Sequence, residues 1–153
     1  MGSDNQAGLS PAEQRDLHRI AGIMIPANVE YRVPGADDPD IFADIVRSIG
    51  RDLPDVRTAL GELSRLAGGD FAALGATEAE AVASELLASE TPAVTTLGRV
   101  ILQCYYRDDR VLLSLGVEPR PPFPKGHVLE QGDWSLLDVV KQRKPFWRDD
   151  RAV

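Results

Sequence analysis

The chain has 153 residues, of which 43% are hydrophobic and 27% are charged, and its formal net charge at pH 7 is −7. This length and composition are typical of one soluble globular domain with its own core, and the acidic balance argues against nucleic acid or an anionic membrane as a partner. No apolar run approaches the roughly 18 residues that a membrane span needs, so we expect no span. Cys104 is the one cysteine, which excludes an internal disulfide and a cysteine metal cluster.

The first half of the chain carries start and stop signals for three helices. Ser10-Pro11-Ala12-Glu13 has the serine, proline and glutamate of a capping box, and Pro26 ends the helix that it opens. Asp38-Pro39 predicts the start of a second helix, and a third is expected from about Pro54 to Gly68-Gly69. Apolar residues at helical spacing predict the buried faces, which include Leu17, Ile20, Ala21, Phe42, Ile45, Val46, Val56, Leu60 and Leu63.

The second half adds further helices of the same kind. Thr77-Glu78-Ala79-Glu80 has the pattern of a second capping box, and Thr91-Pro92 opens the most apolar helix, which we expect to be central. Cys104 lies on the apolar face of this helix, which makes its thiol part of the core. A short helix should follow Asp108 and end at Gly116. Since no alternating strand pattern occurs, the predicted fold is all-α, a compact bundle of five or six helices.

The last part of the chain, from about residue 117 to 153, is predicted to be an extended proline-rich arm of the single domain 1–153. Its prolines exclude a helix and favour a stiff polyproline II segment, whereas Ser135-Leu136-Leu137-Asp138 predicts a short last helix. Aromatic residues and arginine are favoured at the centre of interfaces, and a preordered segment loses less entropy on docking. We therefore expect the arm to contact a partner through Pro121, Phe123, Pro124, His127, Trp134, Trp147 and Arg148. Packing of Trp134 and Phe123 on the chain's own bundle is the alternative.

The sequence lacks the usual signatures of catalysis. There is no glycine-rich dinucleotide or phosphate-binding motif, and the two histidines, His18 and His127, have no second metal ligand at helical spacing. We therefore expect no catalytic, cofactor-binding or metal-binding residue in this chain. An enzyme that uses His18 or His127 with nearby carboxylates is the least favoured interpretation.

Three stretches in the last third of the chain carry a family resemblance. They are Tyr105–Gly116 (YYRDDRVLLSLG), Arg120–His127 (RPPFPKGH) and Gly132–Leu137 (GDWSLL). Together with Ile25-Pro26 and Pro34-Gly35-Ala36 near the start, they make the chain similar to the gluconate 2-dehydrogenase subunit 3 family. The resemblance covers most of the chain and is most specific in these C-terminal motifs.

The resemblance implies an accessory role. Small subunits of this family are partners of a large flavoprotein of the glucose–methanol–choline oxidoreductase family, which holds FAD and oxidises an alcohol or sugar hydroxyl. We therefore expect a chaperone-like subunit that stabilises the flavin-carrying large subunit of a heteromeric dehydrogenase and has no cofactor of its own. A cytochrome or other electron acceptor is left open as a further partner. The alternative function is a stand-alone helical protein-binding module with an unrelated partner.

The compartment is left open by the sequence. Exported members of the family usually carry a twin-arginine signal on the small subunit, and no paired arginines precede Ser10. The lack of a visible signal predicts a cytoplasmic protein. Removal of the native N-terminus, or a signal on the partner, predicts a periplasmic one.

Overall fold

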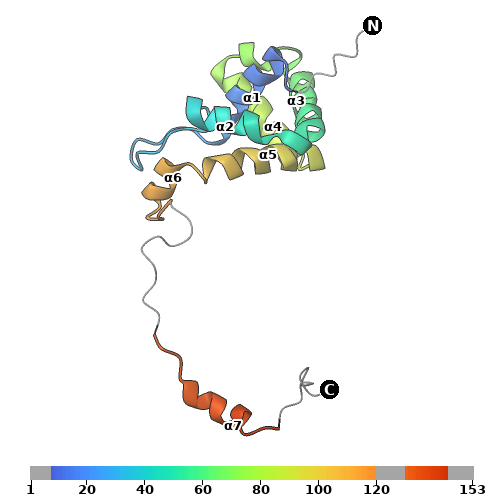
Figure 1. The fold of residues 1–153 in the computed structure, drawn as a ribbon. Helices are drawn as coiled ribbons and strands as arrows, with labels where there is room; N and C mark the ends of the chain where they lie inside the picture. Colours follow the sequence, from blue (N-terminus) through green and yellow to red (C-terminus); the bar gives the residue numbers. More distant parts are fainter. Residues whose placement is uncertain (1–7, 120–129, 145–153) are drawn as a thin grey trace. The chain divides into compact units, whose positions relative to one another are not determined.

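The structure is a computed structural model, and it describes residues 8–119 and 130–144 (Figure 1). Contacts divide the chain into two units, Met1–Pro119 and Arg120–Val153, which we call the helical unit and the C-terminal unit. The described residues contain α-helices and short 3-10 helices and no strand, which confirms the predicted all-α class. The α-helices are α1 (Pro11–Met24), α2 (Pro39–Ser48), α3 (Leu53–Ala67), α4 (Ala76–Ala88), α5 (Pro92–Tyr105), α6 (Asp109–Ser114) and α7 (Asp138–Lys141). The 3-10 helices are η1 (Gly50–Asp52), η2 (Phe71–Ala73) and η3 (Trp134–Leu137).

Side-chain caps fix the starts of several helices. At α1 the predicted capping box is present: the Ser10 hydroxyl accepts the Glu13 backbone N–H at 3.3 Å, and the Glu13 carboxylate accepts the Ser10 N–H at 2.6 Å. Asp38, Thr91 and Asp108 cap α2, α5 and α6 in the same way. Each cap satisfies a backbone N–H that the helix itself leaves without a partner.

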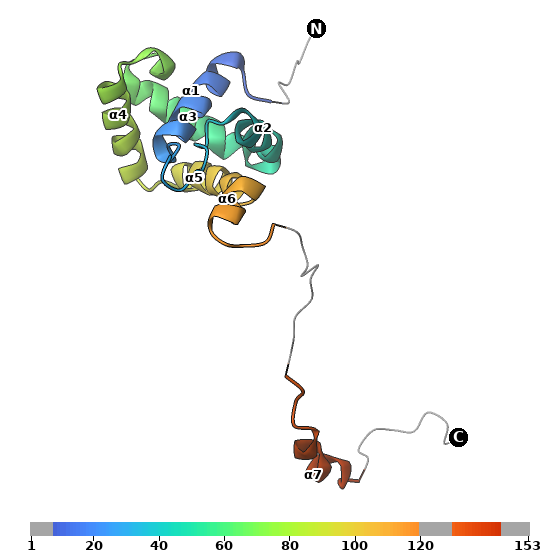
Figure 2. The same ribbon diagram turned by 90° about the vertical axis from the view of Figure 1, so that its left-hand side faces the viewer.

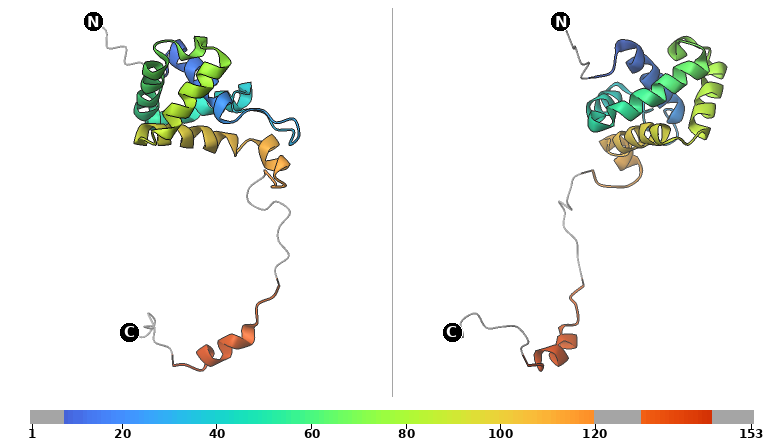
Figure 3. Two further views of the ribbon diagram at one scale, coloured as in Figure 1. Left: turned by 180° about the vertical axis from the view of Figure 1, so that it is seen from behind. Right: turned by 90° about the vertical axis from the view of Figure 1, so that its right-hand side faces the viewer.

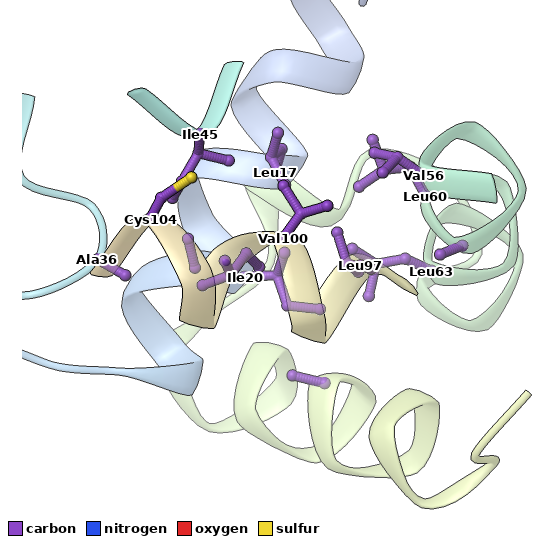
Figure 4. Close-up of a cluster of buried hydrophobic side chains, with 14 of the residues drawn as sticks. Leu17, Ile20, Ala36, Ile45, Val56, Leu60, Leu63, Leu97, Val100 and Cys104 are labelled. Atoms are coloured by element: carbon purple, nitrogen blue, oxygen red, sulfur yellow. The ribbon is translucent and has the colours of Figure 1, made fainter. Parts of the chain in front are cut away.

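The core of the helical unit is built around α5. This helix buries Val94, Leu97, Val100, Ile101, Cys104 and Tyr105, and it packs against α2, α3 and α4. In Figures 1 and 2 it runs along the lower side of the unit, beneath α1, α2 and α3, and the views in Figure 3 agree. Figure 4 shows apolar side chains of α1, α2, α3 and α5 pointing toward one another. The contacts of α5 with three other helices confirm its predicted central position. Full burial of each leucine or isoleucine in this core contributes roughly 1.5–3 kcal/mol to the stability of the unit.

The bend between α3 and α4 is held by an aromatic plug and a buried carboxylate. Phe71 of η2 is fully buried. Asp16 of α1 accepts the backbone N–H of Ala72 at 2.9 Å, and the Arg19 guanidinium donates to the carbonyls of Ala72 and Leu74 at 2.5 and 2.6 Å. Two consecutive turns of α1 therefore hold η2 in place.

The predicted capping box at Thr77 is wrong. Helix α4 begins at Ala76, and Gly75 occupies the cap position with no side-chain cap. The extended backbone of Gly75 presents its carbonyl to the Ala79 N–H at 2.9 Å, so the first helical bond forms before Thr77 can act as a cap. Thr77 lies inside the first turn.

The C-terminal unit contains the short last helix that the sequence predicts, but its start lies earlier. Asp133, not Ser135, is the cap: its Oδ1 accepts the Ser135 N–H at 3.0 Å and the Ser135 hydroxyl at 2.6 Å. The 3-10 turn η3 precedes α7 without a break. Ser135 lies inside the turn that Asp133 caps, and its backbone N–H is one of the groups bonded to Asp133.

Candidate partner-binding site

An exposed apolar segment in the C-terminal unit contains the predicted interface residue Trp134. Trp134 is 66% exposed, and its indole N–H reaches Gln131 Oε1 only at 3.5 Å, a long hydrogen bond. Of the seven residues 134–140, five are apolar and exposed: Trp134, Leu136, Leu137, Val139 and Val140. Only Ser135 and Asp138 are polar. We call these seven residues the 134–140 segment.

Local polar contacts hold this segment in shape without covering its apolar side chains. The hydrogen bonds from Ser135 lower the pKa of Asp133, which keeps this cap charged near neutral pH. Lys141 pairs with Asp138 at 3.1 Å across one turn. The turn is therefore fixed by its own polar groups, and its tryptophan, leucines and valines remain free for contact with another surface.

The other predicted interface residues lie outside the described residues. They are Pro121, Phe123, Pro124, His127, Trp147 and Arg148. Their role in contact stays a prediction.

Sequence reasoning missed a second group of exposed apolar side chains in the helical unit. Leu102 and Tyr106 lie one turn apart at the end of α5, and both are at least 42% exposed. Leu113, Leu115 and Val117 on and after α6 are also exposed. The spacing of Leu102 and Tyr106 at i and i+4, away from the buried face of α5, is the signal that was available in the sequence. Tyr105 is buried and stacks edge to face on Tyr106 at 5.3 Å.

Arg110 holds α6 to the start of α2. Its guanidinium donates to both carboxylate oxygens of Asp38, at 2.7 and 3.1 Å, and to both of Asp108, at 3.0 Å. The hydrogen bonds from Arg110 lower the pKa of both carboxyls and raise the pKa of Arg110 itself. Since Asp38 and Asp108 are also the caps of α2 and α6, one side chain ties two helix starts together.

A second arginine lies beside the buried cysteine. Arg107 pairs with Asp44 at 2.6 Å, donates to the Ser48 hydroxyl and approaches Cys104 Sγ at 3.4 Å. Burial raises the pKa of the Cys104 thiol, which keeps it protonated, in agreement with a core role. The adjoining pocket, of about 400 Å³, is lined mainly by charged side chains, among which Asp44 pairs with Arg107 and Asp108 with Arg110.

His18 is the histidine that lies among the described residues. His18 is exposed and stacks edge to face on Phe42 at 4.8 Å. Within residues 8–119 and 130–144, no three histidine, cysteine, aspartate or glutamate side chains gather as metal ligands. No helix in the same ranges has the length and apolar character needed to cross a bilayer.

Comparisons with protein families, with curated proteins and with solved structures found no match to this chain.

Proposed function

We propose that this chain is the non-catalytic small subunit of a heteromeric FAD-dependent alcohol or sugar dehydrogenase, in which the large subunit carries the flavin. The observation that supports the proposal most is the exposed 134–140 segment. Contiguous exposed apolar side chains mark interaction sites, and tryptophan is the residue type most enriched where interfaces gain their energy. The family resemblance supplies the identity of the partner.

The action of such a subunit is physical. By covering an apolar surface of the folded, flavin-loaded large subunit, the chain stabilises that state by mass action, because it does not bind the unfolded state. FAD on the large subunit supplies the redox chemistry. The residues of this chain bind and exclude water from the surface that they cover.

A stand-alone binding module with an unrelated partner is the alternative function. The two functions differ in whether the flavoprotein, when it is added, protects Trp134 from solvent. In a variant with Trp147→Phe, so that Trp134 is the one remaining tryptophan, the proposal predicts that acrylamide quenches the free chain strongly and the complex weakly. Equal quenching with and without the flavoprotein would favour the unrelated partner.

The proposal is tested by co-purification. The tagged chain is expressed with the large glucose–methanol–choline oxidoreductase encoded beside it, and the mass and visible spectrum of the product are recorded. A stoichiometric yellow complex is expected, and Trp134→Ala with Leu136→Ala should weaken it about tenfold or more, as loss of a hot spot does. Val29→Ala with Tyr31→Ala, which removes exposed apolar side chains from the turn between α1 and α2, is the matched control. A colourless free chain beside a flavoprotein that folds and works alone would contradict the proposal.

A further inference from the structure

A groove runs along one face of α1 on the helical unit. Its volume is about 760 Å³, and Pro11, Arg15, His18 and Gly22 line it at intervals of three to four residues, with Phe42 of α2 and Ala72 of η2 opposite. These intervals place the four α1 residues on a single stripe of the helix. Pro11, Arg15 and His18 are exposed, so the groove is open along its rim. A small ligand is usually buried over most of its surface, whereas an open groove of this kind fits an extended peptide.

The Asp37 carboxylate lies against two glycines at one end of the groove. A Cβ at Gly22 would lie 2.8 Å from Asp37 Cγ, and a Cβ at Gly35 would lie 2.3 Å from Asp37 Oδ1. The carboxylate therefore sits where only glycine leaves room on both sides. Glycine inside a helix costs roughly 1 kcal/mol relative to alanine, and an alanine in place of Gly22 would displace the exposed Asp37 carboxylate. Among the described residues, no hydrogen bond or ion pair to the Asp37 side chain is present.

The other end of the groove is positively charged. Arg19 is fixed by carbonyl oxygens of η2 and its neighbours, and these neutral acceptors leave its charge uncompensated. Arg15 approaches Asp70 only at 3.8 Å, and both side chains are more than half exposed. Such an exposed, loose pair is worth little, so Arg15 is available for a better acceptor.

The middle of the groove is apolar. His18 stacks edge to face on Phe42, which fixes both rings, and Ile23 lies beside Gly22 on the same wall. Seven residues of helix separate Arg15 from Gly22, which is about 10 Å along the axis of α1. Three to four residues of extended peptide span about the same distance.

We propose that this groove binds a short extended segment of the large flavoprotein subunit. The segment has a lysine or arginine that pairs with Asp37, an aspartate or glutamate that pairs with Arg15, and apolar residues between them on Phe42 and Ile23. This inference rests on the proposed function for the identity of the partner. It adds a second contact to the one made by the 134–140 segment, with a stated charge pattern.

Overlapping synthetic peptides that tile the large subunit's sequence, each with a fluorescent label, test the proposal by anisotropy with the full chain. The tightest peptide should contain a basic residue and an acidic residue separated by two to three apolar ones. Asp37→Asn and Arg15→Gln should each weaken its binding about two- to fivefold, the range for exposed ion pairs. Glu80→Gln on α4 and Arg51→Gln on η1 remove the same charges away from the groove and should leave binding unchanged.

A double-mutant cycle identifies the pairing. Replacing the basic residue of the peptide with glutamine should weaken binding to the native chain but not to Asp37→Asn. The same variants are compared for affinity to the whole large subunit, and their urea midpoints show that the fold is kept. Equal affinity of Asp37→Asn, Arg15→Gln and the native chain in both assays would overturn the proposal that the groove binds the large subunit. A stable flavin complex in that case would still support the proposed function. If no complex forms at all, the proposed function falls and the groove proposal falls with it.

Discussion

At the scale of single residues, Arg110 links the start of α6 to the start of α2. Its guanidinium donates two hydrogen bonds to each of the Asp38 and Asp108 carboxylates. Neither lysine nor glutamine can reproduce this two-pronged geometry. We expect Arg110→Gln to destabilise the helical unit by about 1 kcal/mol at pH 7, since the site is partly exposed and screened by solvent. Urea unfolding measures this loss.

The pH dependence of that loss has a definite sign. Arg110 lowers the pKa of Asp38 and Asp108 below the ordinary value of 3.8. The stabilisation is therefore present above the unfolded pKa and is lost as the pH falls through the lower folded pKa. The difference between the native chain and Arg110→Gln should shrink below about pH 4. A difference that stays constant down to pH 2 would show that the arginine acts by packing and not by charge.

Asp16 behaves in the opposite way. It is 8% exposed, and its burial raises the pKa of the carboxyl above 3.8, although the hydrogen bond from Ala72 opposes this. A raised acid pKa means that the charged form costs stability, and this cost grows as the pH rises from the unfolded to the folded pKa. Asp16→Asn keeps an acceptor for Ala72 without the charge. It should be more stable than the native chain at pH 7, by less than about 1 kcal/mol, and equal to it near pH 3.

Thermal or urea unfolding at these two pH values decides the question. Asp16→Ala is the matched control, because it removes the acceptor and should lose about 1 kcal/mol at either pH. If Asp16→Asn is the less stable protein at pH 7, the carboxylate charge strengthens the bond to Ala72 by more than its burial costs.

At the scale of elements, the glycines of α1 and α3 make a matched pair. Gly61 in α3 has no atom within 4 Å of the position of an added Cβ, whereas at Gly22 in α1 the Asp37 carboxylate lies 2.8 Å away. Gly61→Ala should stabilise the unit by about 0.5–1 kcal/mol through helix propensity and chain entropy. Gly22→Ala should gain less or lose stability, because Asp37 must move. Equal gains in urea midpoint would show that the carboxylate moves without cost.

Four helices, α1, α2, α3 and α5, were predictable from the sequence, because the capping residues and the spacing of apolar residues indicate the same segments. The starts of α4 and of the C-terminal turn were not predictable from the sequence. Thr77 and Ser135 are residue types that commonly cap helices, but Gly75 and Asp133 occupy the cap positions in the structure. The position of Asp37 on the groove was also not predictable from the sequence. Its place between Gly22 and Gly35 joins residues of a helix and a loop, and no local pattern carries that information.

At the scale of the whole molecule, the buried core among the described residues belongs to the helical unit. Every buried apolar residue among the described ones lies between Leu9 and Val111, whereas residues 130–144 are all exposed. A chain cut after residue 119 should therefore keep its helical circular dichroism and its cooperative unfolding. Trp134 is the predicted interface residue that lies among the described residues, and it is exposed within its own unit.

The central claim, that this chain stabilises a flavin-loaded partner, is tested most directly by the temperature at which the large subunit releases FAD, followed by flavin fluorescence. We predict that this temperature rises with the concentration of added chain, as it does for any ligand of the native state. The chain cut after residue 119, and Trp134→Ala in the full chain, should lose most of the rise while they remain folded. A release temperature that is the same with and without the chain, at every concentration, would contradict the proposed stabilisation of the flavin-loaded partner.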